Sequence, residues 1–199
     1  MSAPRPAGRR ASGAPEDRLP VEPAMRKTSP RAAPRRAVYA GSFDPPTLGH
    51  LYVIGAGARL FDQLVVAVGM QPGKQYTFTL EERLGFLKAC TRALPNVQLG
   101  HFQDRFLVDY AREAGAQFIL RGIRNPQDME YERALRQINA DLAPELTTVF
   151  VMPPRQLAEV SSSFVKGLVG LKGWSRVVRR FVPPVVYQAF VKRLREPPF

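Results

Sequence analysis

The sequence predicts an α/β fold in which a doubly wound, five-stranded parallel sheet carries helices on both faces. Short apolar segments alternate along the chain with segments of helical periodicity. The apolar segments are continuous instead of alternating with polar residues, as expected of strands that are covered on both faces. The chain has 199 residues, of which 45% are hydrophobic, and this is enough for one packed domain.

The expected strands and helices follow one another in a regular order. Helix starts are well signalled, because Thr79 precedes two glutamates and Asn125 precedes a proline. The expected strands are 37–41, 64–69, 97–100, 117–121 and 147–152. The expected helices are 49–60, 79–93, 105–114, 128–142, one near 162–171, and a last helix that opens at Pro183 and Pro184. Ligands of such sheets bind beyond the carboxyl ends of the strands, so the residues that follow 41, 69, 121 and 152 are the candidate site.

The positive charge of the chain lies mainly at its two ends. The formal net charge is +12, from 29 Lys+Arg against 17 Asp+Glu. Residues 1–36 carry +6 and residues 166–199 carry +7, whereas 37–165 are nearly neutral at −1. Residues 1–35 are rich in Pro, Ala and Arg with few large apolar side chains, which predicts a disordered basic tail before a domain over 36–199 that ends in C-terminal helices. The basic ends leave open a nucleic-acid-binding protein as an alternative.

Composition also bears on the compartment. The single cysteine, Cys90, cannot form an internal disulfide, which favours a reducing environment. No apolar run approaches the roughly 20 residues that cross a bilayer, and the start has no apolar leader. We therefore expect a cytoplasmic protein without a membrane partner.

The clearest motif is GSFDPPTLGH at 41–50, which follows the first strand. Gly41 lets the backbone approach a ligand closely, and Thr47 begins a helix whose free N–H groups and dipole face the same crevice. His50, one turn into that helix, can donate to an anionic oxygen. A lone histidine is more often structural, but the Thr-x-Gly-His context favours the functional interpretation.

Three further candidate segments lie at the same predicted edge. QPGK at 71–74 presents Lys74 after a tight turn, and RGIR at 121–124 places Arg121 and Arg124 on either side of a glycine. Serines 161–163 stand at a helix start, where they supply a cap and anion-binding donors. Taken alone, Lys74 is more typical of a solvated loop, the serines of a cap, and Asp128 of a first-turn acid that complements the helix dipole.

In this order, the motifs resemble the nucleotidylyltransferase superfamily and, within it, the bacterial phosphopantetheine adenylyltransferase family, over about 36–189. The resemblance implies a Rossmann-like fold and reversible transfer of the adenylyl group of ATP to 4′-phosphopantetheine, giving dephospho-CoA and pyrophosphate. It implies that His50 is the catalytic residue. The ATP-binding residues that it implies are Ser42, Phe43, His50, Gly122, Ile123, Arg124, Glu132, Ser161, Ser162 and Ser163. The substrate-binding residues that it implies are Ser42, Lys74, Leu107 and Arg121.

The residues themselves favour direct transfer, because no nucleophile is paired with a base while cations and helix starts converge on one edge. The resemblance further implies Mg²⁺ accompanying ATP and a homo-oligomer, specifically a hexamer. The sequence itself shows no dedicated metal site built from protein side chains. The alternative within the class is adenylyl transfer to nicotinate or nicotinamide mononucleotide. Those relatives typically resemble Ser-Ser-Thr-x-(Ile/Val)-Arg near the end, where this chain has SSSFVK at 161–166.

Overall fold

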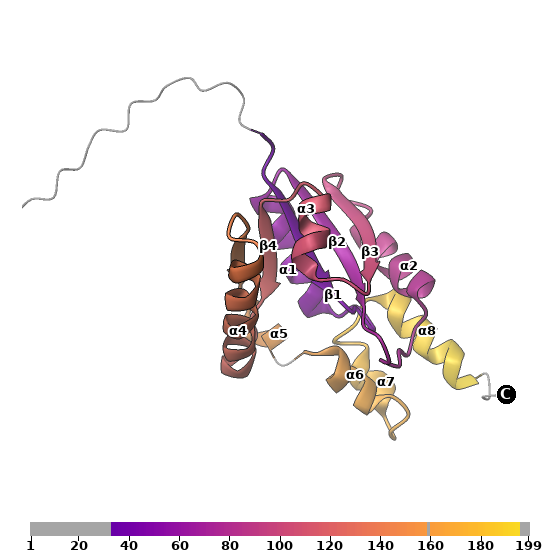
Figure 1. Ribbon diagram of the computed structural model, residues 1–199. Coiled ribbons are helices and arrows are strands. Elements are labelled where there is room, and N and C mark those ends of the chain that lie inside the picture. Colours follow the sequence, from indigo (N-terminus) through magenta and orange to yellow (C-terminus); the bar gives the residue numbers. More distant parts are fainter. Residues whose placement is uncertain (1–32, 159, 196–199) are drawn as a thin grey trace, which may run out of the picture. The chain divides into compact units, whose positions relative to one another are not determined.

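The computed structural model describes residues 33–158 and 160–195, which contain a five-stranded sheet with helices around it (Figure 1). The sheet order is β3-β2-β1-β4-β5, and every neighbouring pair is parallel. The strands are β1 (Arg36–Gly41), β2 (Gln63–Met70), β3 (Val97–Gln103), β4 (Phe118–Gly122) and β5 (Thr147–Val151). The chain moves outward from β1 to one edge and then returns to the other side through β4. The carboxyl ends of β1 and β4 are therefore the topological switch point, where such sheets bind ligands.

The helices agree with the sequence prediction to within a few residues, apart from two short additions. The helices between strands are α1 (Leu48–Leu60), α2 (Leu80–Thr91), α3 (Leu107–Glu113) and α4 (Pro126–Leu142). The helices after β5 are α5 (Arg155–Ala158), α6 (Ser162–Leu168), α7 (Trp174–Val178) and α8 (Pro184–Arg195). Sequence reasoning missed α5 and α7, because segments of four and five residues are too short to show helical periodicity.

Apolar side chains cover both faces of the sheet. On one face, Ile54 of α1 and Leu87 of α2 pack in a buried cluster with Leu64 of β2. On the other face, Val108 of α3 belongs to a second cluster with Ile119 of β4. Figure 1 shows α3 in front of the sheet and α1 behind it. This arrangement confirms the predicted doubly wound fold, and it explains why the central strands are continuously apolar.

The C-terminal helices form a cluster of their own against the start of α2. Val165 of α6, Val178 of α7 and Phe190 of α8 are buried together with Phe78, which precedes α2. Phe78 and Phe190 meet edge to face, with ring centroids 5.0 Å apart. This cluster fixes the position of α6, whose first residues lie beside the site described below.

Most of the predicted basic tail, residues 1–32 of 1–35, lies outside the described residues. Arg35, at its end, already contacts the sheet, because its carbonyl accepts from the Gln63 N–H of β2 at 3.2 Å, and its own N–H donates to the Asp62 carboxylate at 2.8 Å. No helix in the described ranges is long and apolar enough to cross a membrane.

Candidate active site

The start of α1 holds His50 in a defined orientation and protonation state. Thr47 caps the helix and its hydroxyl accepts from the His50 backbone N–H at 3.4 Å. In return, the Thr47 backbone N–H donates to Nδ1 of the His50 ring at 3.0 Å, so the histidine completes a capping box. A backbone N–H can only donate, so Nδ1 is an acceptor and the neutral ring carries its proton on Nε2.

The surroundings of His50 keep the ring neutral. Burial and, after it, the positive charge of Arg124 lower the pKa of His50 to about 4. The Phe43 ring packs against the imidazole edge to face, with centroids 5.2 Å apart, and Phe43 itself is buried. At neutral pH, His50 therefore presents an N–H donor without a full positive charge.

A cavity of about 310 Å³ opens at the carboxyl ends of β1 and β4, the place that the sheet topology indicates. It is lined from β1, α1, β4, α4 and the start of α6, which are far apart in the sequence. The sequence-predicted site residues among its lining are His50, Arg121, Gly122, Arg124, Glu132, Ser161, Ser162 and Ser163. One pocket therefore brings together the two arginines, the histidine and the serines.

Each of the two arginines from the RGIR motif meets a carboxylate of α4. Arg121 donates from Nε to Glu132 at 2.7 Å and from Nη2 to the other oxygen of the same carboxylate. Burial acts to lower the pKa of Arg121, but the hydrogen bond and the charge of Glu132 outweigh it and raise this pKa. Arg124 donates to Asp128 from Nε at 2.7 Å and from Nη2 at 3.0 Å. Both guanidinium groups are thus held in a fixed plane by paired hydrogen bonds.

The three serines at the start of α6 have different partners. Ser161 is the N-cap, and its hydroxyl accepts from the Phe164 N–H at 3.0 Å. Ser162 donates to the carbonyl of Pro45 at 2.8 Å, which joins α6 to the loop before α1. Ser163 is exposed and lines the pocket.

The remaining predicted site residues are not part of the pocket lining in the described structure. Ser42, Phe43 and Ile123 adjoin lining residues, and the buried side chains of the last two leave only their backbones to meet a ligand. Lys74 is exposed, with its ammonium 5.6 Å from the centre of the Tyr76 ring. Leu107 begins α3 and packs against the cluster on that face of the sheet.

Sequence reasoning missed several lining residues, including Tyr39, Asp128 and Tyr131. Tyr39 lies within an apolar strand and was not predicted as a site residue, although its position near the carboxyl end of β1 was the available signal. Burial raises the pKa of its hydroxyl, so Tyr39 remains an uncharged donor. The interpretation of Asp128 as a first-turn acid was incomplete, because Asp128 also holds Arg124.

Comparisons with known proteins identify the family of the chain. Residues 38–168 match the model of the family described as cytidylyltransferase-like. A phosphopantetheine adenylyltransferase of Neisseria meningitidis serogroup C is 58% identical over 155 residues, covering 78% of this chain and 91% of the relative. The chain belongs to the phosphopantetheine adenylyltransferase family. The family member of Chromobacterium violaceum is 49% identical over 162 residues, covering 81% of this chain and 99% of that protein. This family member is therefore a nucleotidyltransferase.

Solved structures support the fold alone. A nicotinic acid mononucleotide adenylyltransferase of Plasmodium falciparum, complexed with NaAD, superposes with a TM-score of 0.61 at 12% identity, covering 81% of this chain and 96% of that chain. A putative nicotinate-nucleotide adenylyltransferase of Vibrio parahaemolyticus gives a TM-score of 0.56 at 17% identity, covering 79% and 98%. These likenesses confirm the Rossmann-like fold.

Proposed function

We propose that this phosphopantetheine adenylyltransferase family member reversibly transfers the adenylyl group of ATP to 4′-phosphopantetheine, giving dephospho-CoA and pyrophosphate for coenzyme A biosynthesis. The observation that carries the proposal is the joint placement of His50, Arg121 and Arg124 in one pocket at the switch point of the sheet. The relatives with 49–58% identity favour this acceptor over the mononucleotides and over a nucleic-acid-binding role.

The proposed step is a direct displacement. An oxygen of the acceptor phosphate attacks the α-phosphorus of ATP, and the bond to the pyrophosphate oxygen breaks as pyrophosphate leaves. The Nε2–H of His50 donates to an oxygen of the α-phosphate, where negative charge builds up in the transition state. Because the pKa of the protonated His50 ring is about 4, the ring is neutral at pH 7, and its Nε2–H donates a hydrogen bond without giving up its proton.

The other residues bind and orient the substrates in this scheme. Arg121 and Lys74 orient the acceptor phosphate, with Ser42 and Leu107 as further acceptor contacts. The ATP contacts are Ser42, Phe43, Gly122, Ile123, Arg124, Glu132 and Ser161 to Ser163. The proposed role of Lys74 requires that its exposed ammonium approach the bound acceptor. A fixed guanidinium plane suits a phosphate, which accepts paired hydrogen bonds.

Magnesium enters this scheme as part of the ATP substrate. In the described ranges, no group of three or more His, Cys, Asp or Glu side chains is placed to hold a metal ion. The lining carboxylates Asp128 and Glu132 each hold an arginine. We therefore assign the Mg²⁺ ligands mainly to phosphate oxygens, which this ion prefers.

The family resemblance also supports a homo-oligomer, which we propose to be a hexamer, acting in the cytoplasm. The single cysteine of the sequence suits a reducing compartment. Sedimentation or light scattering of the purified protein measures the oligomeric state directly.

The decisive experiment measures pyrophosphate release from ATP with each candidate acceptor in turn. We expect turnover with 4′-phosphopantetheine and little with nicotinate or nicotinamide mononucleotide, or with pantetheine, which lacks the attacking phosphate. Turnover only with a mononucleotide would instead support the alternative acceptor. A nucleic-acid-binding protein would show steeply salt-dependent binding to DNA or RNA that is lost when residues 1–35 are deleted.

A further inference from the structure

Asp44 is a buried carboxylate in the loop between β1 and α1, outside the set of predicted site residues. Its side chain is 1% exposed, and it lies between Ser42 and His50 in the sequence. It accepts from the backbone N–H of Thr77 at 3.0 Å and of Phe78 at 2.9 Å. It also accepts from the ammonium of Lys166 at 3.0 Å.

These contacts join three segments that carry site residues. Asp44 itself belongs to the loop that leads to His50. Thr77 lies in the segment between β2 and α2, three residues after Lys74, and Lys166 belongs to α6, which begins at the pocket serines. The hydrogen bond from Ser162 to the Pro45 carbonyl attaches the start of α6 to the same loop.

The chemistry of Asp44 makes these contacts strong. A buried carboxylate is unfavourable unless charge and hydrogen bonds compensate for its lost hydration. Burial acts to raise the pKa of Asp44, but the N–H groups of Thr77 and Phe78 and the charge of Lys166 lower it overall. Asp44 is therefore ionised at neutral pH, and its neighbours are held by charge-assisted hydrogen bonds.

Lys166 lies in the motif whose serines line the pocket, yet its ammonium contacts Asp44. It is not among the described residues that line the cavity. The structure thus gives Lys166 a partner within the protein.

We propose that Asp44 is a positioning residue for both substrates and that Lys166 is its counter-ion. Asp44 holds the Lys74 segment through Thr77 and Phe78, and it holds α6 through Lys166, so that both are attached to the loop that leads to His50. This inference rests on the proposed function, since its main measurements use ATP and 4′-phosphopantetheine.

Two substitutions separate the two connections. In the wild type, Thr77 and Lys166 donate to one carboxylate oxygen of Asp44, and Phe78 donates to the other. In Asp44→Asn, the side-chain NH2 group replaces one of these oxygens, so in either orientation of the amide it faces a hydrogen-bond donor. We expect the KM for both substrates to rise by about five-fold or more, as for loss of a charged hydrogen bond. In Lys166→Met, Asp44 keeps its backbone partners, so only the KM for ATP should rise. Lys166→Arg, which retains the charge, should have a KM for ATP within about two-fold of the wild-type value.

A double-mutant cycle distinguishes positioning from direct phosphate binding by Lys166. If Lys166 acts through Asp44, the two single substitutions raise the KM for ATP to a similar extent, and the double variant is no worse than either. If Lys166 binds phosphate directly, Asp44→Asn frees the ammonium for ATP and leaves that KM unchanged or lower. The second result would overturn the proposal.

Hydrogen exchange of the ligand-free protein gives an independent test, which also decides the matter if Asp44→Asn does not fold. In α6, the Phe164 N–H bonds to the Ser161 hydroxyl and the Val165 N–H to the Ser161 carbonyl. We expect these amides to exchange faster in Lys166→Met than in the wild type. Unchanged exchange contradicts the positioning role. If Lys166 acted only by binding a phosphate of ATP, it would not hold α6 in the ligand-free protein, and its loss would leave these exchange rates unchanged.

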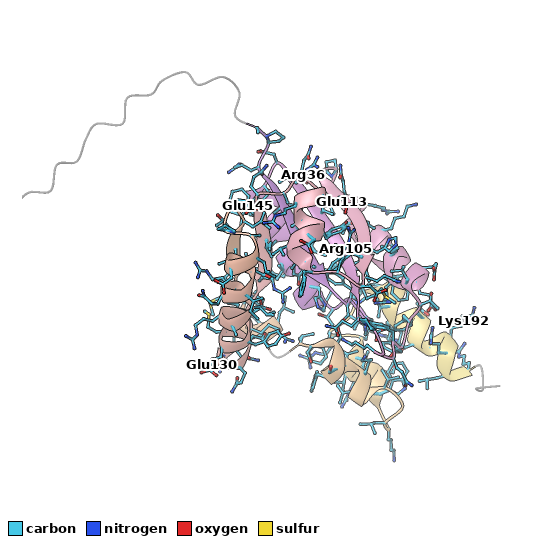
Figure 2. The ribbon with its side chains drawn as sticks, in the orientation of Figure 1. Arg36, Arg105, Glu113, Glu130, Glu145 and Lys192 are labelled. Atoms are coloured by element: carbon cyan, nitrogen blue, oxygen red, sulfur yellow. The ribbon has the colours of Figure 1, made fainter. Side chains whose placement is uncertain are left out.

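The control variant is Glu145→Gln, which breaks an exposed ion pair with Arg112 away from the pocket. Figure 2 shows Glu145 and Glu130 near opposite ends of α4. This control should keep wild-type KM values and α6 exchange. Wild-type protein that shows no turnover would contradict the proposed function, whereas normal wild-type turnover with unchanged Asp44→Asn KM values would contradict only the positioning role.

Discussion

Arg121 at the end of β4 and Glu132 in α4 form a bidentate ion pair in the wall of the pocket. Glu132 is buried, and Arg121 also donates to the Ala40 carbonyl of β1 at 3.2 Å. The pair fixes the plane of the guanidinium before any substrate arrives. A preorganised cation gives up less conformational freedom when it binds a phosphate than a free side chain does.

Glu132→Gln should destabilise the protein, because it leaves the guanidinium of Arg121 in a buried site without its charge partner. Removing one member of a buried ion pair costs about 3 kcal/mol or more. Urea unfolding followed by circular dichroism measures this change. Glu145→Gln is the matched control, and its exposed pair should contribute little. A Glu132→Gln variant as stable as the wild type would show that the buried pair is unimportant for folding.

His50→Ala should lower kcat by roughly 100-fold or more, as does loss of one preorganised donor at a developing negative charge. His50→Gln should lose less, because its amide can still donate. Steady-state pyrophosphate release provides the comparison, with thermal unfolding to confirm that both variants fold. Near-normal kcat in His50→Ala would remove the histidine from the mechanism.

The His50 ring should stay neutral well below pH 6.5. Its folded-state pKa of about 4 lies below the ordinary value of 6.5, so between these pH values the unfolded chain takes up a proton that the folded protein does not. Stability should therefore fall as the pH drops from 6.5 towards 4, and His50→Gln should lose this part of the dependence. Ring ¹⁵N NMR should show the proton on Nε2 at pH 6, with His101→Gln used to assign the two histidines of the chain. A charged His50 ring at pH 6 contradicts this assignment.

Arg83→Lys should weaken both the fold and catalysis. Arg83 is fully buried, donates to the Ser42 carbonyl at 2.8 Å and to the Thr79 carbonyl at 3.2 Å, and stacks over Tyr76. Lysine cannot reproduce this fork, so buried acceptors lose partners at a cost of about 2 kcal/mol. Denaturation and kcat/KM measure the two effects, and the exposed Arg92→Lys in the same region is the control. If kcat/KM is unchanged, the Ser42 backbone does not depend on Arg83.

The parts that could be predicted from the sequence are those determined by local chemistry. The cap at Thr79, the cap at Asn125 and the apolar strands appear in the structure as expected. The sequence also indicated that His50 follows a helix start, because Thr47 lies three residues before it. It did not indicate that the two residues cap one another, which requires the observed ring orientation.

Partnerships between distant segments could not be predicted in this way. The sequence singled out Arg121 and Glu132, but their pairing depends on how α4 meets β4. Asp44 belongs to the GSFDPPTLGH motif, but no role could be predicted for it, because its role arises only where three segments come together. The placement of Lys74 outside the cavity lining likewise depends on the path of an exposed loop.

Helix α4 contacts the sheet mainly through ion pairs, and not through a row of buried apolar side chains. Among its 17 residues, all of them described, Glu132 is the buried one, while Met129 and Ile138 are exposed. Its first half meets the strand edge through Glu132 and Asp128, which hold Arg121 and Arg124. In the proposed reaction, the anionic substrates use the same two guanidinium groups that hold this helix. Substrate binding should therefore be energetically linked to any movement of α4.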